Sequence, residues 1–342
     1  MAVERTGLTV LYTPESKSIV VECVFSQHTA SALFFTIELI SFCVSSVIFV
    51  HGLQGHPERT WRHGGGGSHK NHDATSPKLR GASVTALLKK KWRKQVETSP
   101  TSPRPPASVY WPKDLLPKLC PDARIMTFGY DTVITRGYGS IDQGNIFSHA
   151  KDLLYELSRS REKGRNIVWV AHSLGGIIVK DVLRRSNMAR IAEIQDILNS
   201  TTGVVFMGTP HRGSPEIASV GDTIRRVAQS VLRMNTNEQV IRALGLDSPE
   251  LELCRESFIY QWQNLGFQVK TFQEAKALTG LKLGFLGGKV VSDTSSSLDD
   301  PQERAESIAA NHMDMCRFSG PEDPGFKKVG GVIQEFCKFR PS

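Results

Sequence analysis

The chain has 342 residues, enough for one large α/β domain or two small ones. A hydrophobic content of 39% and a charged content of 22% are ordinary for a soluble globular protein, and the six cysteines form no C-x-x-C pair, which argues against a zinc site or a disulfide framework. The net charge of +8 comes from ten basic and two acidic residues between Arg62 and Ala107, so the rest of the chain is neutral and a nucleic-acid partner is not expected.

Residues 1–46 are expected to combine N-terminal strands with a hydrophobic insertion. From Ala30 to Val50 the sequence has 21 residues with one charge, Glu38, which is long enough for a membrane span. Glu38 lies in the middle of this run, and its last residues continue into a motif that belongs inside the fold. We therefore favour a buried strand preceded by an inserted helix, while membrane contact through residues 23–50 stays open. The segment lacks a basic n-region and a small-residue cleavage site, so we expect no secretory signal.

Residues 62–107 have the composition of a disordered, basic surface insertion. They contain GGGGS, the run KKKWRK at 89–94 and the Pro-rich TSPTSPRPP. Such segments bury too little apolar surface to offset the entropy lost on ordering. The run at 89–94 has the charge to contact anionic lipid headgroups or to act as a nuclear import signal, although we favour a solvated loop with neither role.

The remaining sequence alternates short apolar runs with helical patterns. The expected strands are 47–50, 124–128, 166–171, 203–207, 267–272 and 289–292, and the expected helices are 147–159 and 177–185. Residues 215–265 leave the sheet pattern and have helical apolar spacing, which predicts a cap over a cleft. Alternating strands and helices with continuous β-branched runs predict an α/β fold for residues 47–342, with a mostly parallel central sheet and helices on both faces.

The stretch AHSLG at 171–175 lies between an expected strand and an expected helix, which is the context of the G-x-S-x-G nucleophile elbow. Ala171 replaces the first glycine of that pattern, and a small side chain suffices where positive φ is not required. Gly175 and Gly176 allow the helix to begin close to the sheet. Ser173 is therefore a candidate nucleophile. The alternative is a serine N-cap in an ordinary strand-to-helix turn.

The strand at 47–50 ends in the turn HGLQG. In hydrolases with a nucleophile elbow, an early turn of this kind supplies one half of an oxyanion hole. We expect the N–H of Leu53 to be one donor and the N–H of Leu174, at the start of the helix, to be the other. Gly52 permits the close approach of the backbone, and we assign His51 a structural role rather than that of the base.

The candidate base is His312. The motif GTPHRGS also offers His211, but that residue follows Ser173 by only one strand, and in the expected order of catalytic residues the histidine comes last. We assign His211 to the floor of the cleft. His312 is the only histidine after His211 and follows the last expected strand, at 289–292. The alternative for His312 is an exposed loop histidine.

The candidate acid is Glu274, which follows the expected strand at 267–272. An acid is expected directly after the penultimate strand, before the histidine. Asp293, after the expected strand at 289–292, is the alternative acid, and it would lie one loop too late if that strand is the last.

Six stretches resemble one family. VIFVHGLQGHPERTW, WPKDLLP, ARIMTFGYD, WVAHSLGG, GVVFMGTPHRGS and NHMDMCRF are similar to the lipase-like serine esterases grouped with the serine active site-containing protein. Similar domains stand at the N-terminus of many fungal NACHT- or NB-ARC-type receptor proteins. The resemblance covers roughly 45–61 and 108–342, with 23–46 and 62–107 as apparent insertions. It implies an α/β-hydrolase fold and a role linked to lipid handling. Carried onto this chain, its triad and oxyanion donors are Ser173, His312, Leu53 and Leu174, with Glu274 on the shorter match FQE.

The sequence thus predicts a serine hydrolase, an esterase or lipase-like enzyme that acts on an ester or lipid through an acyl-enzyme on Ser173. No metal or organic cofactor is expected. The alternatives are a catalytically inactive interaction or signalling module with a protein partner, and a lipid transacylase. Scattered cysteines predict an intracellular, cytoplasmic protein. The resemblance adds the mitochondrial or endoplasmic-reticulum membrane as an alternative location.

Overall fold

The computed structural model of the chain describes residues 2–14, 45–64, 108–131, 146–212, 225, 227, 250–277 and 289–339. Its centre is a seven-stranded sheet with the strand order β1-β5-β2-β6-β7-β8-β9. The strands are β1 (Gly7–Tyr12), β2 (Ser45–Val50), β5 (Ala123–Gly129), β6 (Asn166–His172), β7 (Thr201–Met207), β8 (Gln268–Glu274) and β9 (Arg304–Ile308). All neighbours pair in parallel except β1 and β5. The predicted mostly parallel central sheet is confirmed.

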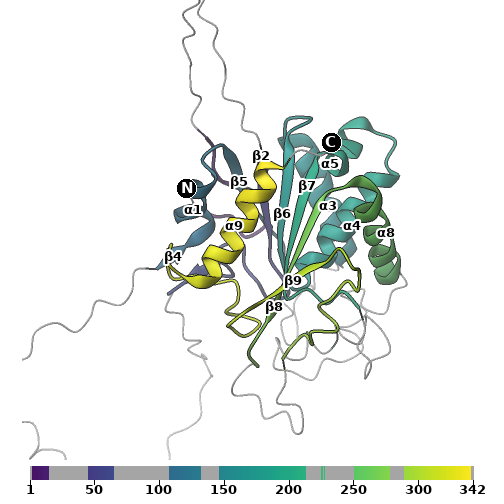
Figure 1. Cartoon of the computed structure of the whole chain (residues 1–342). Helices are drawn as coiled ribbons and strands as arrows, with labels where there is room; N and C mark the ends of the chain where they lie inside the picture. Colours follow the sequence, from purple (N-terminus) through teal and green to yellow (C-terminus); the bar gives the residue numbers. More distant parts are fainter. Residues whose placement is uncertain are drawn as a thin grey trace, which may run out of the picture.

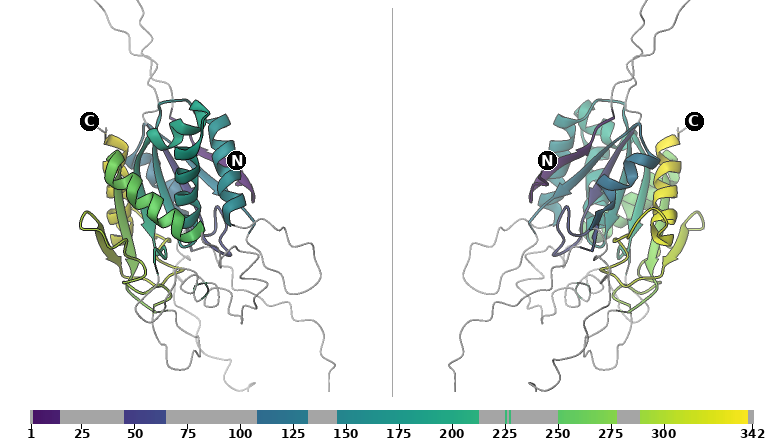
Figure 2. Two further views of the ribbon diagram at one scale, coloured as in Figure 1. Left: turned by 90° about the vertical axis from the view of Figure 1, so that its right-hand side faces the viewer. Right: turned by 90° about the vertical axis from the view of Figure 1, so that its left-hand side faces the viewer.

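Helices cover both faces of the sheet, as predicted (Figures 1 and 2). One face carries α3 (Ile146–Ser160), α4 (Gly175–Met188), α5 (Ala192–Asn199) and α8 (Glu250–Leu265). The other face carries α1 (Trp111–Asp114), α2 (Leu116–Leu119) and α9 (Pro324–Lys338). Each face has its own hydrophobic core. A separate two-stranded sheet pairs β3 (Arg62–His63) with β4 (Val109–Tyr110).

Strand β6 shows why the central strands are continuously apolar. Trp169 and Ala171 pack into the core on the α4 side, whereas Val168 and Val170 pack into the core on the α9 side. Successive side chains of a strand point to opposite faces, so a strand covered on both faces needs apolar residues at every position. This demand explains the uninterrupted run that leads to Ser173.

The end of the sheet differs from the prediction. Residues 289–292 form no strand, and the N–H of Val291 donates to the carboxylate of Glu274 instead of to a neighbouring strand. The last strand of the described chain is β9, which was not predicted. Its sequence RAESI is mostly exposed at the edge of the sheet and lacks the apolar run of a central strand.

The predicted insertions lie largely outside the described residues. Of the segment 23–46 only Ser45 and Ser46 are described, and they begin β2; of 62–107 only residues 62–64 are described, and they include β3. Strand β1 pairs with β5, so the N-terminal segment shares one sheet with the rest of the fold. No helix in the described ranges has the length and apolar character needed to cross a membrane.

The predicted cap, residues 215–265, is described in two parts. Its last third is α8, which packs beside α4 through Cys254 and Phe258 in the core of that face. Of residues 215–249, only Arg225 and Val227 are described. The cap itself therefore stays a prediction.

Lys180 is a buried cation on α4. Its side chain is 1% exposed, and its ammonium lies 5.6 Å and 5.5 Å from the ring centroids of Phe206 and Phe258. No described residue accepts a hydrogen bond from it. Burial lowers the pKa of Lys180 from 10.5 to about 7, because the charged form loses its hydration.

We expect Lys180→Met to raise the free energy of unfolding by roughly 1–4 kcal/mol at pH 7, since a buried charge is replaced by an apolar side chain of similar length. Between pH 7 and pH 10.5 the unfolded state of the wild type binds the extra proton, so its stability rises with pH and the advantage of the variant shrinks. Urea denaturation at pH 7 and pH 9.5 measures both effects. Lys151 is exposed, so Lys151→Met is the control. Equal changes in the free energy of unfolding for the two variants at both pH values would contradict the prediction.

Candidate active site

Ser173 lies in a strained turn between β6 and α4. Its φ is +52°, in the left-handed region that costs a residue with a side chain about 1–2 kcal/mol. The Ser173 N–H donates to the carbonyl oxygen of Met207 at 2.9 Å, which ties the turn to β7. The residue before α4 is Leu174, and no side chain caps this helix. The strained backbone and the absent cap bond speak against an ordinary N-cap serine.

The glycines around Ser173 are required by close contacts. A Cβ atom on Gly175 would lie 2.5 Å from the carbonyl oxygens of both Val50 and His51. A Cβ atom on Gly52 would lie 2.6 Å from the Cβ of Ser173. Real Cβ atoms do not come this close to other heavy atoms, so the end of β2 and the start of α4 meet only because both positions are glycine.

His312 is the side chain that contacts the hydroxyl of Ser173. Its Nε2 lies 3.0 Å from Ser173 Oγ, although the two residues are 139 positions apart. His312 is completely buried, which excludes the exposed-loop alternative. Burial also holds the pKa of His312 well below its usual range. A neutral imidazole in this position can accept the proton of the serine hydroxyl.

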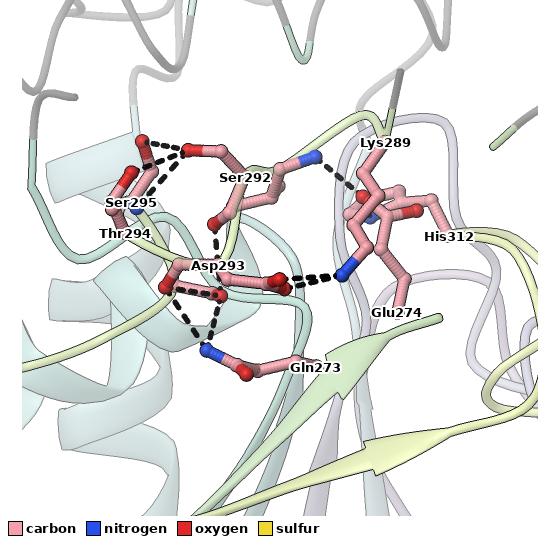
Figure 3. A network of polar contacts seen from close by, with 10 residues as sticks. Gln273, Glu274, Lys289, Ser292, Asp293, Thr294, Ser295 and His312 are labelled. Carbon is pink, nitrogen blue, oxygen red and sulfur yellow. Dashed lines mark hydrogen bonds and ion pairs between the residues drawn. The ribbon is translucent and has the colours of Figure 1, made fainter. Parts of the chain in front are cut away.

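Glu274 lies on the other side of the His312 ring. Its side chain is 1% exposed, and its Oε1 is 3.8 Å from His312 Nδ1. The same oxygen accepts a hydrogen bond from the N–H of Val291 (Figure 3). Burial raises the pKa of the Glu274 carboxyl to about 7. The carboxyl and the imidazole are therefore close enough to pair, but they do not form a short hydrogen bond in this structure.

Asp293, the alternative acid, has a different environment. Its carboxylate binds the ammonium of Lys289 at 2.5 Å and 2.7 Å, and 57% of its side chain is exposed (Figure 3). Its carbonyl oxygen accepts a hydrogen bond from the Gln273 side chain. Of the two candidate acids, the fold brings Glu274 to the base.

The two predicted oxyanion donors, Leu53 and Leu174, lie in the turn after β2 and directly before α4. The turn after β2 is tight: the Gly55 N–H donates to the Gly52 carbonyl at 3.0 Å, and Gln54 has a φ of +52°. Among the described residues, no acceptor takes the N–H of Leu53 or that of Leu174. Both residues are buried, at 4% and 2% exposure. Within the part of the chain that the structure describes, both N–H groups are therefore free to donate to a bound group.

The ring of His51 supports this turn. Its Nδ1 is 2.9 Å from the Gly52 carbonyl oxygen, and its Nε2 accepts the N–H of Tyr130 at 3.4 Å. The ring stacks on Tyr130 with centroids 4.3 Å apart. Burial lowers the pKa of His51 to about 3. With both nitrogens engaged in the scaffold, His51 has no free position from which to act as a base.

His211 lies beside the end of β7 rather than against Ser173. Its backbone N–H donates to the Ser295 carbonyl at 2.7 Å, and its ring contacts the ring of Phe206 with centroids 4.6 Å apart. It is fully buried, and neither ring nitrogen has a hydrogen-bond partner among the described residues. This placement is consistent with a role in shaping the region beside the nucleophile.

Sequence reasoning missed the residues that hold the base. The Asn311 side chain accepts the N–H groups of Met313 and Asp314 at 3.0 Å each, a local turn that the N-x-x-D spacing could have suggested. His172 contacts the His312 carbonyl oxygen at 2.9 Å. That contact spans 140 residues, so no sequence signal predicts it. Within the described ranges, no group of His, Cys, Asp and Glu side chains could hold a metal ion.

Comparison with curated proteins gives relatives of low identity. Protein SERAC1 of Mus musculus is 26% identical over 282 residues, which are 80% of this chain and 36% of the relative. Protein SERAC1 of Homo sapiens is 28% identical over 232 residues, 67% of this chain and 30% of the relative. The chain thus spans about a third of the length of these relatives. No protein-family model matches the chain. The resemblance to fungal NACHT- and NB-ARC-type proteins stays a prediction.

Solved structures with similarity to the chain include a lipase-esterase related protein from Clostridium acetobutylicum, with a TM-score of 0.39 and 12% identity over 85% of this chain and 94% of that one. A thermophilic esterase from Thermogutta terrifontis has a TM-score of 0.37 and 14% identity over 85% of this chain and 89% of its own. The topology of the chain itself identifies the fold. A mostly parallel sheet carries a strained serine elbow after β6, an acid at the end of β8 and a histidine after β9, so the chain has an α/β-hydrolase fold.

Gly175→Ala tests the close contact at the elbow. We expect the free energy of unfolding to fall by about 1–3 kcal/mol, because the new methyl group meets backbone oxygens that cannot move aside. The matched control is Gly331→Ala, in the exposed interior of α9, where nothing lies within 4 Å and a gain of about 0.5–1 kcal/mol is expected. Chemical denaturation of both variants measures the difference, and a Gly175→Ala protein as stable as its control would contradict the packing described here.

Proposed function

We propose that the chain is a serine hydrolase that cleaves carboxylic esters, lipid esters among them, through an acyl-enzyme on Ser173. The observation that carries the proposal is the 3.0 Å contact between Ser173 Oγ and His312 Nε2 at a strained strand-to-helix turn. A hydroxyl is a weak nucleophile unless a neighbouring base removes its proton. The neutral, buried imidazole of His312 is such a base.

The reaction proceeds in two steps. His312 Nε2 takes the proton of Ser173 as Oγ attacks the ester carbonyl, and the resulting imidazolium gives that proton to the departing alkoxide. Water then attacks the acyl-enzyme with the same histidine as base, which releases the carboxylic acid and restores the serine. The N–H groups of Leu53 and Leu174 are the proposed donors to the oxyanion in both steps.

Glu274 is the proposed acid of the triad. As the imidazolium forms, the buried carboxylate stabilises its charge and holds the proton on Nδ1, leaving Nε2 free to accept from the serine. The distance of 3.8 Å between the two groups is long for a hydrogen bond. Catalytic hydrogen bonds are often long in a free enzyme and shorten when the substrate is bound.

Two other functions compete with this proposal. An inactive interaction module would not need a base against the serine hydroxyl. The N–H groups of Leu53 and Leu174, which have no acceptor among the described residues, would serve no purpose in it. A transacylase would use the same residues, with an alcohol or lysolipid in place of water. The lipid substrate class rests on the resemblance of the sequence motifs. Membrane contact through residues 23–50 or 89–94 concerns segments that lie almost entirely outside the described residues.

The proposal predicts that a fluorophosphonate probe labels the wild-type protein on Ser173, since such probes need an activated serine. Ser173→Ala should stay unlabelled, whereas Ser158→Ala, a change at a half-buried position of α3, should label like the wild type. Mass mapping of the labelled peptide identifies the site. A folded wild type that resists probes of different chain length would favour the inactive module.

The protonation of Glu274 should make activity depend on pH. Activity on a p-nitrophenyl ester should fall as the pH drops below about 7, because Glu274, with its pKa of about 7, takes up a proton and can no longer stabilise the imidazolium. Glu274→Gln should lower kcat/KM about 10²–10⁴-fold and remove this limb of the profile.

Asp293→Asn is the control for the acid assignment, and its kcat/KM should stay within about threefold of the wild type because an exposed ion pair contributes little. A large loss in Asp293→Asn, or an unchanged acid limb in Glu274→Gln, would contradict the assignment.

A further inference from the structure

His172 is a buried histidine that the proposed reaction does not use. It is the last residue of β6, directly before Ser173, and is 4% exposed. Its Nε2 lies 2.9 Å from the carbonyl oxygen of His312, and the two ring centroids are 4.9 Å apart. The strand that carries the candidate nucleophile is thereby joined to the residue that carries the candidate base.

The chemistry of this contact fixes the state of the His172 ring. A carbonyl oxygen only accepts, so Nε2 of His172 must carry the proton, and Nδ1 is then the unprotonated nitrogen. Burial lowers the pKa of His172 to about 4, which keeps the ring neutral at physiological pH. The nitrogen that faces the His312 segment is therefore a donor, which rules it out as a base for Ser173.

The His312 segment needs such a tie because it belongs to no helix or strand. On its upstream side, the Ala310 carbonyl accepts the N–H groups of Ala275 and Lys276 at 3.1 Å each, directly after Glu274. On its downstream side, Asn311 closes the local turn. The first pair of bonds connects the His312 segment to the segment after Glu274, and the second pair lies within the His312 segment. Among the described contacts, the bond from His172 is the one that connects the backbone of His312 to the nucleophile strand.

We propose that His172 is a positioning residue, which fixes the backbone of His312 through its Nε2–H and so holds the imidazole within reach of Ser173 Oγ. The inference rests on the proposed function, because it gives the histidine before the serine a role in the same reaction. A displacement of about 1 Å in such a geometry is enough to slow a reaction about 10²-fold. The side chain acts on the alignment of the base and touches neither the substrate nor the transferred proton.

The test compares His172→Phe, which keeps a planar ring but removes the donor, with His172→Gln, whose amide nitrogen can replace Nε2. We expect His172→Phe to lower kcat on a p-nitrophenyl ester, and the rate of fluorophosphonate labelling, about 10–100-fold with KM within about threefold. His172→Gln should recover most of both rates. A wild-type rate in His172→Phe, or an equal loss in the two variants, would overturn the inference.

A second measurement needs neither a His172 variant nor catalysis, so it tests the inference even if the His172 variants fold poorly. Nitrogen-15 spectra of histidine-labelled wild type and Ser173→Ala should show His172 in the Nε2–H form, with slow exchange of that proton. The Nδ1–H form would overturn the inference. If the wild type neither labels nor turns over while His172 is in the Nε2–H form, the proposed function fails and the structural link between the two histidines stands.

Discussion

The fold depends at one point on the close approach of backbones around Ser173. Gly175 lies against the carbonyl oxygens of Val50 and His51, and Ser173 donates its N–H to Met207. A side chain on residue 175 is not compatible with this packing, and Ser173 adopts a φ of +52° within it. The local strain persists because β6 is buried between two cores and holds the turn in place. Everything proposed for the site follows from the position that this turn gives to one hydroxyl.

The parallel sheet explains how distant residues meet there. The carboxyl ends of parallel strands lie at one edge, so the segments after β2, β6, β8 and β9 converge although the chain separates them widely. The side chains that gather at this edge are polar and completely or almost completely buried: His51, His172, Ser173, Glu274 and His312. Burial favours the neutral form of each ionisable group. It lowers the pKa of these three histidines, which keeps their rings neutral at pH 7, and raises that of Glu274 to about 7.

The sequence predicts those parts of this arrangement that have a local signal. The apolar run before Ser173 and the glycines after it predict β6 and α4, and the order of catalytic residues predicts that a late histidine is the partner. Strand β9 escapes prediction because an exposed edge strand carries no apolar pattern. Helix α9 was not predicted either, although its Asp323-Pro324 start and the apolar spacing from Phe326 to Phe336 are usable signals. The contact of His172 with His312 is purely tertiary, so no local pattern encodes it.

The carboxyl of Glu274 is held by contacts from two segments that are distant in the sequence. It is shared between the N–H of Val291 and the imidazole of His312, so the segment that does not form the predicted strand supplies a donor to the acid instead. A donor to a carboxylate favours the charged form, whereas burial favours the neutral one, and burial prevails here. An imidazolium that forms beside this carboxyl favours its ionised form, because the interaction between the two charges offsets the loss of hydration. The hydroxyl of Ser173, the imidazole of His312 and the carboxyl of Glu274 therefore lie in one buried row, with 3.0 Å between the first two groups and 3.8 Å between the last two.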